Sequence, residues 1–441
     1  MNGVTNPIET EKRVSQEQPV EVSRLTEHLF RHEAGKLVSV LTGIFGIDRL
    51  QLAEDVVQEA LIRAMQTWPY YGIPKNPAAW LTQTAKNLAL DLIRREKLFR
   101  DKQAQITITF EQWSPDSGAE PSAAFESEIK DDRLRLMFVC CHPLLPAEAQ
   151  TALALKTLCG FSPAEIAKAF LTTEAAITKR LTRAKQRIRE LGIAFEIPTG
   201  EEFSVRLDVV LQTLYLLFNE GYKASSGPKL IREEICQEAI RLATVLAEHP
   251  AGNLPQTHAL LALMLLNGAR LRTRVDVEGN ILRLQEQDRA HWDRAMIARG
   301  MFYLVQSAAG EEISHYHFQA AIAACHASAE DYKSTDWAKI LSLYDQLIEI
   351  DDSPVVALNR AVAVANVQGP KAGVEALEAI QNRGKLSSYH LLYAIRAELE
   401  IRLNHRKTAA EFFRKALELA ETKSERTFLT KRLKACEGSA I

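Results

Sequence analysis

The sequence has few of the features that mark secreted proteins, membrane proteins or proteins stabilised by a structural metal. Its 441 residues include six cysteines and no CxxC pair, so neither a disulfide framework nor a zinc site of paired cysteines is predicted. The segment Met1 to Val20 is polar and lacks the apolar core of a signal peptide. The longest apolar run, Ala259 to Leu266, is far too short to cross a bilayer. We expect a cytoplasmic protein with no membrane segment.

One cysteine cluster could suggest a metal site. Cys140, Cys141 and His142 are consecutive, but adjacent residues on a helix point in different directions, which makes tetrahedral ligation by both thiols awkward. Buried free thiols in a reducing compartment are the better interpretation. We expect no metal and no cofactor.

The chain also lacks an excess of either charge. It has 54 Lys and Arg against 56 Asp and Glu, a formal net charge of -2, so any surface for nucleic acid must be local. Two segments concentrate positive charge. Residues 177–190 hold six basic side chains against one acid, and residues 86–102 hold six against three. These segments are the candidates for contacts with DNA.

Recognisable catalytic motifs are missing as well. The sequence contains no nucleophile elbow, phosphate loop or HExxH pattern. The stretch Asn219 to Tyr222 ends a predicted helix, and Gly221 explains that stop without any chemistry. The chain is therefore not predicted to be an enzyme. The side chains of the extension whose chemistry would suit catalysis are Asn219, Glu220, Tyr222, His258, His291 and Asp293.

The most informative segment, Ser162 to Arg189, is typical of a helix-turn-helix. Ser162, Pro163 and Glu165 form the cap, first turn and capping box of a short helix. A longer helix follows, capped by Thr172 or Thr173. Its inward stripe has a 3.6-residue period and comprises Ile177, Leu181, Ala184 and Ile188. Basic side chains flank this stripe, as expected of a helix lying between the phosphate walls of a DNA major groove.

Two further helices precede it. In Ala53 to Met65 we expect Val57, Leu61 and Met65 to pack inward, which leaves a surface suited to a basic partner helix. The acidic and amide side chains expected on that surface are Glu54, Asp55, Gln58 and Glu59.

The second helix, Asn76 to Arg95, should bury Leu81, Ala85, Leu88 and Leu92. A neighbouring stripe holds Trp80, Thr84, Asn87, Asp91 and Arg94. An aromatic ring, an amide and a carboxylate in one row suit the stacking and hydrogen bonding that hold unpaired bases.

Together these segments resemble the sigma-70 family of bacterial transcription initiation factors, in particular the small extracytoplasmic-function (ECF) type. AEDVVQEALIRA is similar to region 2.2, PAAWLTQTAKNLALDLIRR to regions 2.3 and 2.4, and the helix-turn-helix to region 4. The resemblance implies binding to the RNA polymerase core, through the β′ clamp helices and β flap, and to promoter DNA.

The resemblance also implies roles for particular residues. The polymerase-binding residues would be Asp55, Gln58 and Glu59. The −10 strand would face Trp80, Asn87, Asp91, Arg94 and Arg95, beside a flipped-base pocket shaped by the loop Tyr70 to Pro77. The −35 duplex would face Thr173, Glu174, Ala176, Thr178, Lys179, Arg180 and Arg183.

The expected organisation is all-α, in six parts. These are a flexible tail (1–23), region 2 (24–98), a linker (99–125), region 4 (126–192), a helical middle domain (203–330) and tetratricopeptide-like repeats (331–441). The linker contains the one short strand candidate, Ile106 to Phe110. The repeats rest on three similar segments, YDQLIEI, VEALEAI and FRKALEL, which begin at Tyr344, Val374 and Phe413.

The extension beyond region 4 is the departure from a minimal ECF factor. It resembles the long ECF subgroup with a fused tetratricopeptide-like extension, which implies regulation by the extension, with a signal ligand or protein partner. An alternative is a stand-alone helix-turn-helix regulator with a helical ligand- or protein-binding domain. The upstream helix with Trp80, Asn87 and Asp91 argues against it, because a plain repressor does not need that helix.

Overall fold

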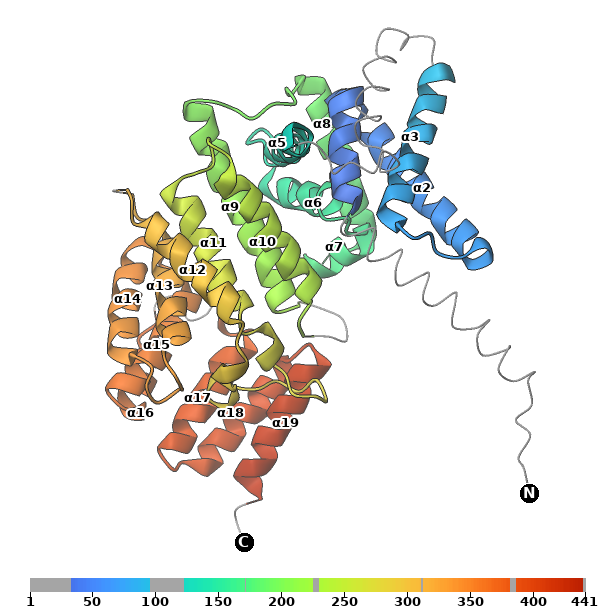
Figure 1. The fold of residues 1–441 in the computed structure, drawn as a ribbon. Helices are drawn as coiled ribbons and strands as arrows, with labels where there is room; N and C mark the ends of the chain where they lie inside the picture. The colour runs from blue at the N-terminus through green and yellow to red at the C-terminus, as the bar shows by residue number, and fades with distance from the viewer. Residues whose placement is uncertain are drawn as a thin grey trace, which may run out of the picture. The chain divides into compact units, whose positions relative to one another are not determined.

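The structure is a computed structural model, and it describes residues 33–95, 123–170, 172–224, 230–310, 312–380 and 386–438. The described residues contain helices and no strand, and one isolated bridge pairs Val275 with Ile281. The prediction of an all-α chain is confirmed (Figure 1). No helix among the described residues has the length and hydropathy needed to cross a membrane. The tail 1–23, most of the linker 99–125 and the strand candidate Ile106 to Phe110 lie outside these residues.

The chain divides into two compact units. Unit 1 is Met1–Thr213 and unit 2 is Leu214–Ile441. The division falls inside one helix, α9 (Glu201–Tyr222), rather than at the break after region 4 that the sequence suggested.

Unit 1 begins with a helical segment at 33–45 and a short 3-10 turn, η1 (Ile47–Arg49). The helices that follow are α2 (Leu50–Tyr71), α3 (Pro77–Arg95), α5 (Ala123–Cys140), α6 (Ala147–Thr157), α7 (Pro163–Ala169) and α8 (Glu174–Leu191). Helix α2 packs against α3, and α8 packs against both α6 and α7. The first half of α9 belongs to the same unit, where Phe203 lies against Phe138 with ring centroids 5.2 Å apart.

The inward face of α2 differs in part from the prediction. Val57 and Leu61 are buried, but Met65 is 52% exposed, so the prediction for Met65 was wrong. Small side chains take inward positions instead, since Ala60 and Ala64 of α2 are both fully buried. The remaining buried residues of α2 are Leu50, Ala53, Val56 and Trp68.

In α3 the predicted inward stripe holds for its first half. Leu81 and Ala85 are buried, whereas Leu88 and Leu92 are only half-buried and Ala89 takes the next inward position. The prediction steps by four, three and four residues, whereas the buried positions Leu81, Ala85 and Ala89 step by four, so the buried face drifts around the helix and away from Leu88.

The helix-turn-helix has the predicted form. The Glu165 carboxylate accepts from the Ser162 amide at 2.9 Å, and the Ser162 hydroxyl accepts from the Glu165 amide at 3.2 Å, which completes the capping box of α7. Thr173 caps α8 by accepting from the Ala176 amide at 3.2 Å. All four predicted inward residues of α8 are buried.

Unit 2 continues from α9 with a group of helices around α11. They are α10 (Glu233–Glu248), α11 (Pro255–Gly268), α12 (Arg294–Ser307) and α13 (His315–Ser328), with the 3-10 turns η4 (Leu271–Thr273), η5 (Leu284–Glu286) and η6 (Arg289–His291). Helix α11 is apolar on all sides and packs against α10, α12 and α13, which explains the long apolar run in the sequence.

Gly221 has a different role from the one predicted. It lies inside α9, and a Cβ there would meet the Cys236 amide nitrogen at 2.6 Å. The residue permits the close approach of α9 and α10 and does not end the helix.

The rest of unit 2 is an array of adjacent helices (Figure 1). They are α14 (Trp337–Ile350), α15 (Pro354–Val367), α16 (Pro370–Glu378), α17 (His390–Arg402), α18 (Arg406–Leu419) and α19 (Lys423–Glu437). The three similar segments of the sequence begin on α14, α16 and α18, the alternate helices of the array. Apolar clusters between neighbouring helices stabilise it, with Leu377 and Phe413 fully buried.

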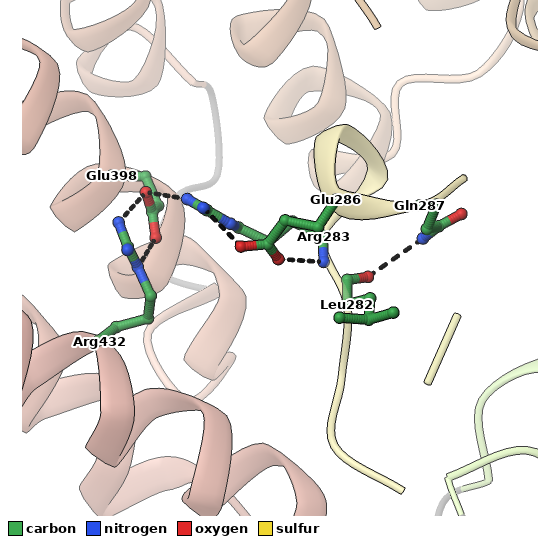
Figure 2. Close-up of polar contacts among 6 residues, drawn as sticks. All are labelled: Leu282, Arg283, Glu286, Gln287, Glu398 and Arg432. Atoms are coloured by element: carbon green, nitrogen blue, oxygen red, sulfur yellow. Dashed lines mark hydrogen bonds and ion pairs between the residues drawn. The ribbon is translucent and has the colours of Figure 1, made fainter. Parts of the chain in front are cut away.

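A charged network joins the two parts of unit 2 (Figure 2). Arg283, which precedes η5, donates to Glu398 of α17 at 3.2 Å. Arg432 of α19 holds the same carboxylate through two hydrogen bonds, at 2.6 and 2.7 Å. Such bidentate, charge-assisted bonds are the strong ones in proteins, so the segment after α11 is fastened to the helical array.

Candidate nucleic-acid interface

The outward face of α8 is the candidate surface for duplex DNA. Thr173, Thr178, Lys179 and Arg183 are exposed, as is Glu174 in the first turn, while Ala176 is half-buried. The hydroxyl of Thr178 donates to the Glu174 carbonyl at 2.9 Å, and this bond fixes the orientation of the Thr178 side chain. The helix thus buries one stripe and presents cations on the other side, the arrangement that a major groove accepts.

Arg180 differs from its neighbours on α8. Its guanidinium forms an ion pair with Glu148 of α6 at 2.7 Å, and its side chain is 33% exposed. Any contact between Arg180 and a phosphate must therefore compete with that carboxylate.

The candidate surface for unpaired bases lies on α3. The Asn76 side chain accepts from the Ala79 amide at 3.1 Å, which caps the start of α3. Trp80 is half-buried and meets Trp68 of α2 edge to face, with centroids 5.4 Å apart. Trp80 is therefore anchored on one side and accessible on the other.

The other predicted residues of this surface lie further along α3. The carbonyl oxygen of the Asn87 side chain accepts from Gln83 at 3.2 Å, and both residues are exposed. Asp91 is also exposed. Arg94 and Arg95 belong to α3, but their side chains lie outside the described residues.

Two exposed tyrosines end α2, shortly before α3 begins. Tyr70 and Tyr71, at the end of α2, are 84% and 86% exposed. Gly72 follows with a φ of +84° and ends the helix. The sequence prediction included these residues only as the beginning of a loop. The available signal was a pair of large aromatics directly before Gly72 and Pro74, residues that mark the end of a helix.

The candidate polymerase surface lies on α2. Asp55 accepts from Gln51 at 2.7 Å, and Glu59 pairs with Arg63 at 3.1 Å, all on the exposed side of the helix. Gln58 is exposed as well. The structure therefore places the three predicted residues on one accessible surface.

Glu54 does not stay outside as predicted. Its side chain is only 10% exposed, and its carboxylate forms an ion pair with Lys185 of α8. Lys185 also donates to Gln51 at 2.8 Å. The sequence contains a signal for this burial. Glu54 precedes the buried Val57 by three residues, and Lys185 follows the buried Leu181 by four. Each of the two side chains therefore lies beside a buried stripe of its helix.

Five of the six cysteines are buried, and Cys325 is half-buried. Burial raises the pKa of Cys141 to about 12, and the Cys140 thiol lies 3.1 Å from the Thr157 hydroxyl. All six cysteines are free. No cluster of three or more potential metal ligands occurs in the described part of the chain. The arrangement instead combines a cationic helix face, an anchored tryptophan and an acidic helix surface.

Comparison with known families identifies three parts of the chain. A model of sigma-70 region 2 matches residues 29–99, and a model of sigma-70 region 4 matches residues 135–188. A family of unknown function, DUF6596, matches residues 206–308. The two sigma-70 matches cover the candidate surfaces on α2, α3 and α8.

Similar proteins match either most of this chain or about a third of it. An uncharacterized protein of Rhizobium meliloti (strain 1021) is 39% identical over 87% of this chain and 90% of its own length. The ECF RNA polymerase sigma factor SigL of Mycobacterium tuberculosis (strain ATCC 25618 / H37Rv) is 32% identical over 32% of this chain and 77% of its own length. A probable RNA polymerase sigma factor, RfaY of Xanthomonas campestris, is 28% identical over 31% of this chain and 33% of its own length. No solved structure matches the chain.

Proposed function

The chain belongs to the ECF type of the sigma-70 family, and from this premise we propose how its surfaces divide the work of promoter recognition. As a promoter-directing factor it binds the RNA polymerase core and brings it to specific promoters. The polymerase performs the chemistry, so the factor itself needs neither a cofactor nor catalytic residues. Its place of action is the cytoplasm, where the polymerase and DNA are found.

The −35 element is read by α8. The residues proposed for this role are Thr173, Glu174, Ala176, Thr178, Lys179, Arg180 and Arg183. The exposure of Lys179 and Arg183 opposite a fully buried stripe carries the proposal. The N-terminal turn supplies contacts to base edges, and the arginines supply contacts to phosphates.

The −10 element is held by α3 and the loop before it. Trp80, fixed against Trp68, offers a ring for stacking, and Asn87 offers an amide for hydrogen bonds to an unpaired base. Asp91, Arg94 and Arg95 complete this surface. Melting is then stabilised because bases are trapped outside the duplex.

The polymerase core is bound through Asp55, Gln58 and Glu59 of α2, with the β′ clamp helices as the partner, while region 4 meets the β flap. The acidic and amide side chains of α2 suit a basic partner helix. The resemblance to the family supports these subunit assignments.

The extension regulates this activity. The similarity to SigL covers about a third of the chain, so residues 206–308 and the helical array are additions to a minimal factor. Hydrogen bonds among Arg283, Glu398 and Arg432 join these two parts. This connection supports the proposal that they act together as one regulatory body.

Run-off transcription with core polymerase and a promoter library tests the proposal. Replacing Arg180 and Arg183 by Ala should weaken promoter binding and reduce the salt slope by about one unit for each lost phosphate contact. Binding would be measured by fluorescence anisotropy at several salt concentrations.

The matched control is Arg414→Ala, which removes an exposed arginine of α18 in unit 2 and should leave the slope unchanged. Unaltered promoter binding by the double variant would show that α8 does not read the −35 element. Transcripts that start at specific promoters would separate this factor from a stand-alone helix-turn-helix regulator, which starts none.

A further inference from the structure

Three arginines of unit 2 lie near one another without a carboxylate partner. Arg283 and Arg432, in the same unit, share the carboxylate of Glu398 (Figure 2). The other three arginines, Arg270, Arg274 and Arg289, form no ion pair with any acid in the described part of the chain. They follow α11 and extend to η6, within the part of the extension that matches the family of unknown function.

Two of these guanidinium groups lie against one aromatic ring. The guanidinium carbon of Arg274 is 3.6 Å from the centroid of the Tyr222 ring, and that of Arg270 is 5.5 Å from it. Arg274 also donates to the Tyr222 carbonyl, and Arg270 makes a long contact of 3.5 Å with the side-chain oxygen of Asn267. Burial lowers the pKa of Arg274, and the charge of Arg270 lowers it further. An aromatic face attracts cations but has no net charge, so both positive charges stay unbalanced.

Arg289 and His326 extend this cluster. Arg289 is 4% exposed and donates to the carbonyls of His326 and Ala329 and to the Thr335 hydroxyl, at 2.7, 3.1 and 2.9 Å. All of these acceptors are neutral. Burial lowers the pKa of His326 to about 3, together with the charges of Arg270 and Arg289. The imidazole is therefore neutral at physiological pH and does not repel the cations beside it.

Buried polar atoms of the same residues have unused hydrogen-bonding capacity. The Tyr222 hydroxyl, His326 Nδ1 and Arg289 Nε are buried and form no hydrogen bond with any residue that the structure describes. Such atoms destabilise a fold unless a ligand or water satisfies them. The Arg270 side chain is only half-buried, so solvent reaches its guanidinium. The cluster thus combines unbalanced positive charge with unsatisfied polar groups and access from outside.

The charge of the cluster favours a dianion over a single carboxylate. Arg270 and Arg274 together carry two positive charges, and the neutral His326 adds none. A phosphate monoester has a charge of about −1.5 to −2 at pH 7 and three acceptor oxygens, so it balances this pair. A carboxylate would leave one positive charge unbalanced. Guanidinium groups also match phosphate oxygens through parallel N–H bonds.

We propose that Arg270, Arg274 and Tyr222 bind the phosphate group of a small metabolite, with Arg289 and His326 beside it. The bound phosphate links α9, the segment after α11 and α13 within unit 2. It gives the regulatory extension a ligand of defined chemistry, and for that consequence the inference rests on the proposed function. The binding itself can be measured in the free chain.

Inorganic phosphate is the probe, and isothermal titration calorimetry of the full chain at constant ionic strength measures its binding. Arg270→Gln should raise the Kd at least about tenfold, because it removes a charge-assisted hydrogen bond. The matched control is Arg272→Gln, which removes a neighbouring arginine that is 83% exposed and pairs with Glu233 at 3.7 Å. This control should bind phosphate as wild type does.

Phosphate that binds wild type and both variants equally is held elsewhere, for example on the cationic face of α8, and would overturn the site. Absence of phosphate binding to wild type would overturn it as well. Acetate at the same ionic strength tests the preference for a dianion. Acetate that binds the wild-type chain as tightly as phosphate would contradict the assignment to a phosphate group.

Thermal unfolding separates a ligand site from a purely structural cluster. Arg270→Gln relieves repulsion among cations, and Tyr222→Phe removes a hydroxyl that has no partner. The melting temperature of each phosphate-free variant should therefore equal or exceed that of wild type. Phosphate should raise the melting temperature of wild type and Arg272→Gln and have little effect on Arg270→Gln and Tyr222→Phe. Lower melting temperatures of both variants, with unchanged phosphate binding, would show that these side chains are structural.

Run-off transcription by the same variants separates this inference from the proposed function. Arg270→Gln that loses phosphate binding and differs from Arg272→Gln in transcription supports the regulatory consequence. Equal transcription by the two variants would contradict that consequence and leave the phosphate site supported. Phosphate binding by a wild-type chain that directs no promoter-specific transcription would contradict the proposed function alone.

Discussion

At the scale of single residues, Arg180 already has an acidic partner in the free chain. Its guanidinium lies 2.7 Å from Glu148, whose side chain is 66% exposed. An exposed ion pair of this kind contributes about 0.2–1 kcal/mol and weakens with salt. In the −35 contact proposed above, a phosphate would take the place of this carboxylate.

The variant Glu148→Gln should raise the affinity for −35 DNA by up to about fivefold at low salt, because Arg180 no longer has to leave a carboxylate. The gain should shrink as salt increases. Fluorescence anisotropy with a −35 duplex measures it. Glu190→Gln, at the far end of α8, is the control for general loss of negative charge. Equal gains in both variants would show that the pairing itself has no effect.

At the scale of elements, the stability of α8 depends on the hydrogen bonds at its C-terminal end as well as on the cap at its N-terminal end. Gly192 takes a left-handed conformation, with φ +59° and ψ 38°, and the Gly192 and Ile193 amides donate to the carbonyls of Arg189 and Ile188. This turn satisfies carbonyls that the last turn of a helix leaves unpaired. A side chain at this position is strained whatever the surrounding space.

Gly192→Ala should destabilise the last turn of α8 by about 1 kcal/mol, and Gly192→Asn should cost less because asparagine tolerates the left-handed region. Hydrogen exchange of peptides covering α8 measures the difference. The order wild type, Asn, Ala in decreasing protection is expected. Equal protection in all three would mean that the helix end is held by something other than this turn.

At the scale of the whole molecule, α9 belongs to both units, and this decides where the chain can be cut. Phe203 and Leu207 are buried in unit 1, and Thr213 lies 3.6 Å from the Cys141 thiol. Leu217 and Phe218 are buried in unit 2. Removal of everything after residue 200 therefore takes part of the core of unit 1 with it.

Deletion of residues 201–441 should expose Phe138 and lower the hydrogen-exchange protection of α5, because the loss of a buried phenylalanine ring costs about 3–5 kcal/mol. Deletion of residues 223–441, with Leu217 and Phe218 replaced by Gln, should keep α5 protected. Run-off transcription by the second variant then tests regulation by the extension. Increased activity would indicate restraint, lost activity a required contact, and unchanged activity would contradict a regulatory role.

Much of the fold was predictable from the sequence because it depends on neighbours in the chain. The caps at Ser162 and Thr173 and the buried stripe of α8 follow from hydrogen bonds and periodicity within a few residues. The exposed faces of α2, α3 and α8 were predictable for the same reason. The functions expected of these faces came from the family resemblance. The error at Met65 arose because the width of a buried stripe depends on the helix packed against it.

By itself, the sequence determined which segments are helices, where α7 and α8 begin, and which helix faces carry charge. Only the tertiary structure decided that Glu54 turns toward Lys185, that Gly35 lies against Leu158, and that the division between the units falls inside α9. The physical reason is the separation along the chain of the residues that interact. Caps and stripes are made by residues within one or two turns, whereas an ion pair across 131 residues exists only once the helices have packed.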